Sequence, residues 1–384
     1  MGSSFLNGRN LSGYIDFWGG FLYNENMTHT LKKTALCAAC EQAGGKMVDF
    51  HGWLLPVQFD SIIAEHKAVR EDCGMFDVSH MGQIRIVGKE ALHLLQYVSC
   101  NIIKSDASAG TYFHMLTEQG TIIDDAIAFC LSLEEFLVVV NAACVDEDFA
   151  WLTKQAAAFN VQVSNESDRW GMIALQGPHA VSVADKILPG VLNLPRFHIK
   201  EIELFGAKGY ITRTGYTGED GVEIMLPNGQ IEALWNALLK LGVKPCGLGA
   251  RDVLRLEAGY LLNGADANQT KTPYEAGCGW VVKLSKENFI GKAALEAKKA
   301  AGFKTQLKAF KLKTPGVPRE GCKVFYQGKE AGTLTSGTYS PLFKGIAVGY
   351  VASEIAVGAE VEIEIHGRKV PAEVVKTPFY KNRV

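Results

Sequence analysis

Apolar residues follow two spacings that predict alternating strands and helices over roughly the first 300 residues of this chain. Alternation at every second position is typical of strands in MFDVSHMGQIRIVG, TYFHMLT, TIIDDAIAFCL, EFLVVVN and GVEIML. Helical spacing is found in KEALHLLQYVS, DEDFAWLTKQAAAF, HAVSVADKIL and QIEALWNALLKLG. Because hairpins such as EIELFGAKGYITRTG are interleaved with these helices, we expect an α+β fold of ferredoxin-like units rather than a parallel sheet.

Two helices near the start of the chain can be predicted in more detail. A helical pattern from Met27 through Leu36 and Ala39 predicts a helix that ends at the Gly44-Gly45 break. The segment DSIIAEHKAVRE, residues 60–71, predicts a second helix with Asp60 as its N-cap.

The last part of the chain has a different pattern. After the lysine-rich segment 298–304 the helical spacing stops, and short strands alternate with turns, which is typical of a β-barrel or sandwich. We therefore expect a body over residues 27–300 and an all-β barrel domain over residues 301–384. Residues 1–26 have neither the basic start nor the continuous apolar segment of a signal peptide, so we treat them as an unassigned extension.

Composition excludes several classes of protein. Hydrophobic residues at 47% and charged residues at 21%, without an apolar segment long enough to cross a bilayer, indicate a soluble protein with no membrane partner. A net charge of −2 argues against a general attraction to nucleic acid. Nine cysteines, an odd number scattered through apolar segments, suit reduced thiols, so we expect a cytoplasmic location. The single CxxC, Cys37 and Cys40, is typical of core packing, and we expect no metal.

The segment ITRTGYTGEDGVEIML places acids in a glycine-rich turn before a strand. Glu219 and Asp220 would repel a phosphate, so we reject a nucleotide-binding loop. In the strand that follows, alternation places Glu223 and Met225 on the face opposite Val222 and Ile224. A carboxylate among apolar neighbours requires a partner. Two partners stay open: a salt bridge, or a ligand that presents two parallel N–H groups. The arginines available for the salt bridge are Arg213, Arg251 and Arg255.

A second pair of acids lies in TIIDDAIAFC. Alternation places Asp125 with Ile123 and Ile127 on one face and Asp124 on the other. The pair is typical of a polar strand end, but a carboxylate flanked by apolar side chains has a perturbed pKa, and such groups gather at functional sites.

The third segment is CGLGARDVLRLEAGYLLNGAD, in which two glycines precede a short helix. Asp252 and Arg255 are spaced to pair at the helix surface. Arg251 lies in the first turn, where the helix dipole opposes a cation. Two interpretations stay open: an exposed turn, or an anion partner such as Glu223 or a ligand carboxylate. His80 lacks the partners of a catalytic triad and is typical of a packing histidine, and no residue is a candidate for covalent catalysis.

Together these segments resemble the T-protein family of the glycine cleavage system, the tetrahydrofolate-dependent aminomethyltransferases. The similarity runs from about Leu31 to Tyr380, and RTGYTGEDG followed by GLGARD is its most specific part. The resemblance implies two discontinuous ferredoxin-like domains and a C-terminal all-β barrel domain in a three-lobed ring with folate at its centre. It also implies the reaction: the methylene of an aminomethyl group on the dihydrolipoyl arm of the lipoylated H protein passes to tetrahydrofolate as co-substrate. The products are 5,10-methylenetetrahydrofolate and ammonia.

The resemblance also implies roles for individual residues. Asp125 matches the essential catalytic carboxylate, which hydrogen-bonds folate near N10 and orients N5. Glu223 matches the acceptor of the pterin N3–H and 2-amino hydrogens. Further positions match the lining of the folate site: Tyr216, Arg251, Met81, Tyr112, Asn141 and Tyr260.

This chain departs from the family pattern in two places. Cys144 stands where the family often has Asn or Ser, so we expect a polar contact near Asn141 to be missing. The tail ends four residues after Tyr380, so the family's C-terminal folate contact has no clear counterpart, and Arg383 is only a candidate for it.

Three alternative functions agree less well with the sequence. A folate-coupled demethylase would carry a flavin domain, for which this chain has no room. A non-catalytic folate-binding relative in iron-sulfur protein maturation would carry a KGCYxGQE signature, where this chain has TPYEAGCGW. A pure scaffold would not need Asp125 and Glu223 inside apolar strands.

Overall fold

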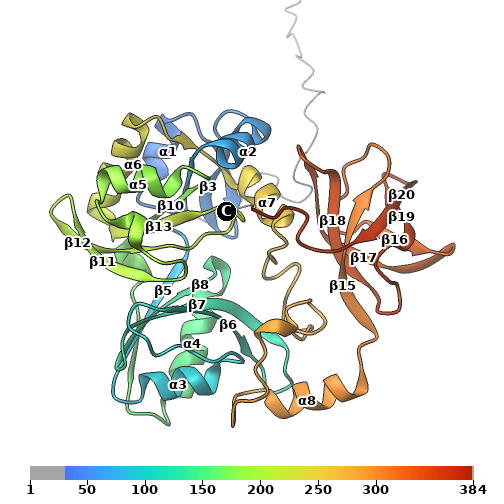
Figure 1. Ribbon diagram of the computed structural model, residues 1–384, viewed down its shortest axis with the longest axis horizontal. Coiled ribbons are helices and arrows are strands. Elements are labelled where there is room, and N and C mark those ends of the chain that lie inside the picture. Colours follow the sequence, from blue (N-terminus) through green and yellow to red (C-terminus); the bar gives the residue numbers. More distant parts are fainter. Residues whose placement is uncertain (1–30, 383–384) are drawn as a thin grey trace, which may run out of the picture.

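The computed structural model describes residues 31–382, which form three open sheets and one closed barrel (Figure 1). The largest sheet has six strands in the order β11-β12-β13-β10-β4-β14. All its neighbours pair antiparallel except β14 with β4, as the hairpins predict. The strands are β4 (Gly74–Asp77), β10 (Trp170–Gln176), β11 (Ile199–Leu204), β12 (Ala207–Thr212), β13 (Gly221–Pro227) and β14 (Lys244–Pro245).

Helices α5 (Ala180–Ile187) and α6 (Asn228–Lys240) pack on this sheet and bury its first core. Val222, Ile224 and Leu226 lie in that core, whereas Met225 lies in another cluster on the opposite face. The predicted alternation of β13 is therefore confirmed.

A five-stranded antiparallel sheet of order β6-β7-β8-β5-β9 forms the second body, with α3 (Ala91–Val98) and α4 (Val145–Ala156) over one face. A shared apolar cluster that includes Phe76, Phe129, Leu137 and Met172 joins the two sheets. The strands are β5 (Gly82–Val87), β6 (Gly110–Leu116), β7 (Ile122–Ser132), β8 (Glu135–Val140) and β9 (Gln162–Asn165).

MFDVSHMGQIRIVG, which predicts one strand, forms β4 and β5 in two different sheets. The separation occurs at Asp77, whose buried carboxylate accepts hydrogen bonds from the Ser79 backbone N–H at 3.0 Å and from Thr34 Oγ1 at 2.6 Å. These bonds hold a local turn in place of the strand ladder.

The N-terminal region corrects both detailed helix predictions. Strand β1 (Lys32–Lys33) joins β2 (Lys46–Phe50) and β3 (Trp53–Gln58), and the helix α1 is confined to Cys37–Gln42. Pairing of β1 with β3 and the bond from Thr34 to Asp77 hold residues 32–34 out of the predicted helix. Helix α2 (Ile62–Glu71) is capped by Ser61, whose side chain accepts from the Ala64 backbone N–H at 3.2 Å, rather than by Asp60. Residues 1–26 and Arg383 lie outside the described residues.

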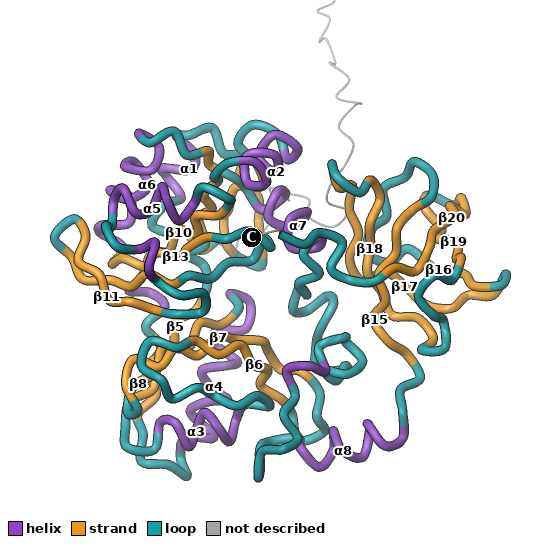
Figure 2. Tube along the Cα trace, viewed as in Figure 1, coloured by secondary structure: helices purple, strands orange, loops and turns teal. Residues whose placement is uncertain are grey.

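Six strands close into a barrel in the order β15-β18-β17-β16-β19-β20, and Figure 2 shows this region built of strand and loop. Helix α8 (Lys292–Ala301) leads into it, and α7 (Leu248–Glu257) lies between the barrel and the six-stranded sheet (Figure 1). The strands are β15 (Thr305–Leu312), β16 (Lys323–Tyr326), β17 (Lys329–Ser340), β18 (Lys344–Ala352), β19 (Glu360–Ile365) and β20 (Arg368–Val375). Among the described residues there are also four short 3₁₀ turns: η1 (Ala142–Cys144), η2 (Ser167–Arg169), η3 (Val191–Asn193) and η4 (Gly279–Val281).

Candidate functional site

The acid Glu223 lies in β13 between β10 and β12, and its carboxylate is only weakly compensated. Its Oε2 accepts a hydrogen bond from Thr214 Oγ1 at 2.5 Å. Burial raises the pKa of Glu223, while Thr214 and the Arg251 charge act in the opposite direction. Within residues 31–382, no arginine forms an ion pair with this carboxylate.

Two of the three arginines that the sequence offers as partners of Glu223 bind other acids instead. Arg213 donates to Asp220 at 2.7 and 3.1 Å. Arg255 is buried and donates to Asp252 at 2.8 Å and to Asp266 at 2.5 Å. The predicted pairing of Asp252 with Arg255 is therefore confirmed, although Arg255 itself is buried and also donates to Ser336 of the barrel.

Arg251 is the third of these arginines and stands in the first half of α7. Its guanidinium carbon lies 4.9 Å from the centre of the Tyr216 ring. Its Nη1 is buried and has no hydrogen-bond partner among the described residues. Burial lowers the pKa of Arg251, and Glu223 acts against that change. An unpaired guanidinium nitrogen and a weakly compensated carboxylate could together hold a ligand that offers both donors and acceptors.

The turn that joins β12 to β13 carries Tyr216 next to Arg251. The Tyr216 hydroxyl donates to the backbone carbonyl of Leu261, and its ring stacks on Tyr260 with centres 5.7 Å apart. Tyr260 is 42% exposed, so this stack forms an accessible aromatic surface. A Cβ on Gly215 would lie 1.9 Å from the Gln176 side chain, so glycine is required for this close approach.

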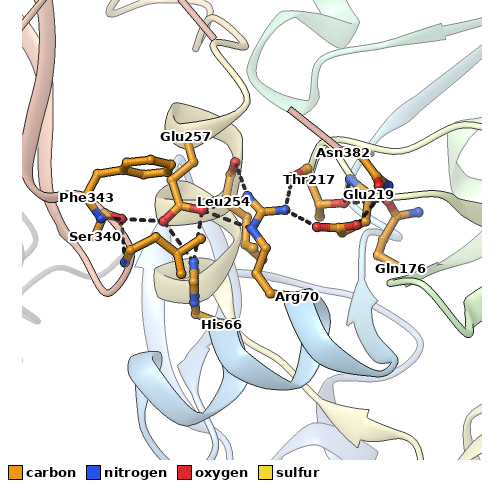
Figure 3. A network of polar contacts seen from close by, with 11 residues as sticks. His66, Arg70, Gln176, Thr217, Glu219, Leu254, Glu257, Ser340, Phe343 and Asn382 are labelled. Carbon is orange, nitrogen blue, oxygen red and sulfur yellow. Dashed lines mark hydrogen bonds and ion pairs between the residues drawn. The ribbon is translucent and has the colours of Figure 1, made fainter. Parts of the chain in front are cut away.

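Both acids of the turn are ion-paired, which explains their presence in a glycine-rich segment. Asp220 binds Arg213, and Glu219 accepts from Arg70 Nη1 at 2.8 Å (Figure 3). Arg70 also donates to the Thr217 carbonyl at 2.7 Å and to Glu257 at 2.7 Å. The turn is therefore held by ion pairs to Arg213 and to the buried Arg70.

The Arg70 network extends to the barrel and to the C-terminal tail. Glu257 also accepts from Ser340 at 2.5 Å and lies 2.9 Å from His66 Nε2 (Figure 3). Asn382 donates to Glu219 at 2.9 Å, and the Tyr380 ring lies 3.9 Å from the Arg70 guanidinium carbon. These contacts connect α2, α7, the barrel and the chain end behind the turn.

The second acid pair lies in β7, on the other sheet. Asp125 is half-buried, and its Oδ1 accepts from Asn141 Nδ2 at 3.1 Å. Burial, followed by the Asp124 charge, raises the pKa of Asp125. Ile123 packs with Ala126 rather than with Ile127, because an extra residue at the start of β7 shifts the register against β6. The predicted face of Ile123 is therefore wrong.

Asp124 is fully buried and accepts three hydrogen bonds. Asn141 supplies two, from its backbone N–H at 3.1 Å and from Nδ2 at 2.8 Å, and Asn263 Nδ2 supplies the third. The Asn141 amide thus bridges Asp124 and Asp125. Cys144 lies beside this group, with Sγ 3.8 Å from Asn263 Nδ2.

Two tyrosines, Tyr112 and Tyr216, lie near the Asp125 carboxylate. Tyr112 is a neighbour whose hydroxyl lies 3.0 Å from His114 Nε2, and its ring stacks on the exposed Trp280 at 5.8 Å. The charge of Asp125 acts on both Tyr112 and Tyr216. The Asp125 group and the Glu223 group are therefore close enough to interact electrostatically.

Met81 and His80, also singled out from the sequence, lie in buried or partly buried surroundings. Met81 is half-buried and packs against the cluster that joins the two sheets. His80 is buried and neutral, because desolvation lowers its pKa to about 3, and its Nδ1 has no partner within the described chain. Cys37 and Cys40 are buried thiols, as expected of core residues.

Several residues of the site carry no sequence signal that would have identified them. Thr214 binds Glu223 across a hairpin turn, and Asn263 reaches Asp124 from 139 positions away. Arg70 is an unremarkable residue of an amphipathic helix. Asn263 is the partial exception, because it lies in the segment CGLGARDVLRLEAGYLLNGAD, which the sequence analysis had already selected as a candidate part of the site.

No helix within residues 31–382 is long and apolar enough to cross a membrane. No group of three or more His, Cys, Asp or Glu side chains is arranged to hold a metal ion there.

Comparisons with known proteins identify the family. Residues 36–286 match the GCVT N-terminal domain, and residues 305–381 match the glycine cleavage T-protein C-terminal barrel domain. The chain is 43% identical to the aminomethyltransferase of Halothermothrix orenii over 357 residues, which cover 91% of this chain and 100% of that protein. It is also 43% identical to the Herpetosiphon aurantiacus aminomethyltransferase, over 92% of this chain and 99% of that protein.

A solved structure agrees with the sequence comparisons. The crystal structure of glycine cleavage system aminomethyltransferase T from Bartonella henselae superposes with a TM-score of 0.86 at 36% identity, covering 92% of this chain and 99% of that one. The chain therefore belongs to the glycine cleavage T-protein family and is an aminomethyltransferase.

Proposed function

We propose that Glu223 and Arg251 form the pterin end of a tetrahydrofolate site. The observation that carries this proposal is the state of these two charges: Glu223 has Thr214 as its donor, and Arg251 Nη1 has no partner among the described residues. A pterin ring offers N3–H and a 2-amino group side by side, which suit a carboxylate. It also offers acceptor atoms for the guanidinium.

Asp125 acts on the other side of the reacting atoms. Its carboxylate, held by Asn141, hydrogen-bonds folate near N10 and orients N5 for attack on the methylene carbon. Its raised pKa brings its titration closer to neutral pH, where a group that exchanges protons works best. Tyr216, Tyr112, Tyr260 and Met81 line the space for the ring system.

The substrate of the transfer is an aminomethyl group on a sulfur of the dihydrolipoyl arm of H protein. Its carbon forms bonds to N5 and N10 of tetrahydrofolate, while its bonds to sulfur and to the amino nitrogen break. The protons released from N5 and N10 balance the thiol and the ammonia that leave. Holding both reactants in one site lowers the barrier by roughly 7 kcal/mol or more.

The architecture suits two reactants that enter from different sides. We assign the body, residues 27–300, to two discontinuous ferredoxin-like domains, and residues 301–384 to the third lobe of a ring around the folate. We assign the protein to the cytoplasm, as its free cysteines suggest.

The decisive assay measures methylenetetrahydrofolate formation from aminomethylated H protein with and without this chain. We expect Asp125→Ala and Asp125→Asn to lower turnover by roughly two orders of magnitude, with folate affinity within about tenfold, because a positioned acid-base group is lost. Glu134→Gln, which changes an exposed acid in the β7–β8 hairpin, is the control. Near-normal turnover of either Asp125 variant would exclude the catalytic role.

Glu223 is tested by binding rather than by rate. We expect Glu223→Ala to weaken tetrahydrofolate binding, measured by calorimetry, by about 10- to 100-fold, which corresponds to loss of a charge-assisted hydrogen-bond pair. Glu203→Ala, an exposed acid on strand β11 of the same sheet, is the matched control. Unchanged affinity of the Glu223 variant would contradict the pterin assignment.

A further inference from the structure

One buried acid near Asp125 has no role in the proposed reaction. Asp148 lies in the first turn of α4 with 0% exposure. Both of its carboxyl oxygens are buried, and neither has a conventional hydrogen-bond donor among the described residues. A buried carboxylate without donors is strongly unfavourable, so its protonation state requires an explanation.

The acidic groups around Asp148 determine that state. The charges of Asp124 and Asp125 of β7 and of Glu147 of its own helix act on Asp148, and Asp148 in turn acts on the Cys144 thiol of η1. Burial, and after it the charge of Asp124, raises the pKa of Asp148. The N-terminal turn of a helix ordinarily favours an ionised acid, so burial and Asp124 act against that preference.

Asp124 and Asp148 differ sharply in their hydrogen-bond donors. Asp124 accepts from two N–H groups of Asn141 and from Asn263. Asp148 accepts from none. Asp148 and Asp124 are within side-chain hydrogen-bond reach of each other, and N–H donors stabilise a carboxylate rather than a neutral acid. The proton therefore resides on Asp148, which can donate it as a hydrogen bond to Asp124.

We propose that Asp148 is a positioning residue: as a neutral acid it donates a hydrogen bond to Asp124 and, through Asp124 and Asn141, fixes the orientation and charge of Asp125. The inference rests on the proposed role of Asp125. The connecting contacts are the Asn141 Nδ2 bonds, 2.8 Å to Asp124 and 3.1 Å to Asp125. Asp148 itself does not touch the reactants.

The test compares Asp148→Asn with Asp148→Ala in the full chain. Asparagine keeps the size and a donor toward Asp124, so we expect the pH profile of kcat to stay in place and kcat to remain within about threefold. Alanine removes the donor. More of the Asp124 charge then acts on Asp125, and we expect the acidic limb of the kcat profile to move up by about half to one pH unit. We also expect kcat at neutral pH to fall about tenfold, with KM for tetrahydrofolate within about threefold.

Asp146→Asn is the matched control, because Asp146 is an exposed acid in the same helix turn. A downward shift of the acidic limb in Asp148→Asn would overturn the proposal, because it would mean that Asp148 carries a charge in the wild type. An unchanged profile and rate in Asp148→Ala would overturn it as well.

Infrared difference spectra provide a readout that does not depend on turnover. At pH 8.5, wild type minus Asp148→Asn should show the carbonyl stretch of a protonated carboxylic acid, and wild type minus Asp146→Asn should not. Absence of that band would refute the neutral state even if Asp148→Ala failed to fold. A wild-type chain without transfer activity would instead refute the proposed function and leave the band unaffected.

Discussion

Replacement of Arg70 by methionine tests whether the buried charges behind the Tyr216 turn stabilise the fold. The Arg70 side chain is 5% exposed, and its partners Glu219 and Glu257 are 2% and 0% exposed (Figure 3). Methionine fills a similar volume but leaves both carboxylates without their main cation. Glu257 retains Ser340 and His66, and Glu219 retains Asn382.

The expected loss of unfolding free energy in Arg70→Met follows from this arrangement. Breaking a buried ion pair by removing one partner costs about 3–5 kcal/mol, because a desolvated charge loses its compensation. We expect Arg70→Met to lose about 4 kcal/mol of unfolding free energy, measured by urea denaturation followed by circular dichroism. Arg70→Lys keeps the charge but not the forked geometry, so its loss should be intermediate.

Lys67→Met is the matched control on the same helix. Lys67 is 67% exposed and pairs with the exposed Glu71 at 3.6 Å, so its loss should stay within about 0.5 kcal/mol. Because Arg70 also fixes the Thr217 carbonyl beside Tyr216, Arg70→Met should raise KM for tetrahydrofolate more than it lowers kcat. A stability loss below about 1 kcal/mol, or one equal to that of Lys67→Met, would refute the reasoning.

Two further predictions concern the same region. His66 and Arg70 hold the pKa of Glu257 below its usual value despite burial, so its contribution is present above about pH 4.3 and is lost as the pH falls through the lowered folded value. Urea titrations from pH 7 to pH 3 should therefore show a steeper loss in wild type than in Glu257→Gln, and parallel curves would contradict this. Gly215→Ala should cost about 1–3 kcal/mol and weaken tetrahydrofolate binding, because its Cβ would lie 1.9 Å from the buried Gln176 side chain. Gly229→Ala, with open space around the added carbon, is the control, and equal effects of the two would exclude the steric explanation.

Local periodicity was sufficient to predict the type of most strands and helices between β5 and α6 and the face of β13 on which Glu223 lies, but it failed at the N-terminal helix, where β1 forms instead. A strand has a period of two residues, so the face of Glu223 follows from its immediate neighbours. The same reasoning failed at Ile123, where one extra residue in β7 inverts the alternation. Such a bulge depends on pairing with β6, which the β7 sequence alone does not specify.

Partners of charged residues could not be predicted because they depend on tertiary contacts. The hairpin brings Arg213 to Asp220, seven positions away, but Arg70 meets Glu219 across 149 positions and Glu257 across 187. The burial of Asp148 likewise could not be predicted from the sequence. An acid in a first helical turn is ordinarily exposed, and only the packing of α4 beside Asp124 buries it.

The distribution of partners around the Tyr216 turn is itself an argument for a ligand. Glu219 and Asp220 are each matched by an arginine, and both arginines also bind backbone carbonyls. A few residues away, Glu223 has a threonine for its donor and Arg251 keeps a buried nitrogen unpaired in the described structure. Leaving Glu223 and Arg251 weakly compensated costs about 1–3 kcal/mol each. If the proposed pterin site is correct, the bound ligand recovers this cost, so tetrahydrofolate binding and stability should be coupled at Glu223 and Arg251.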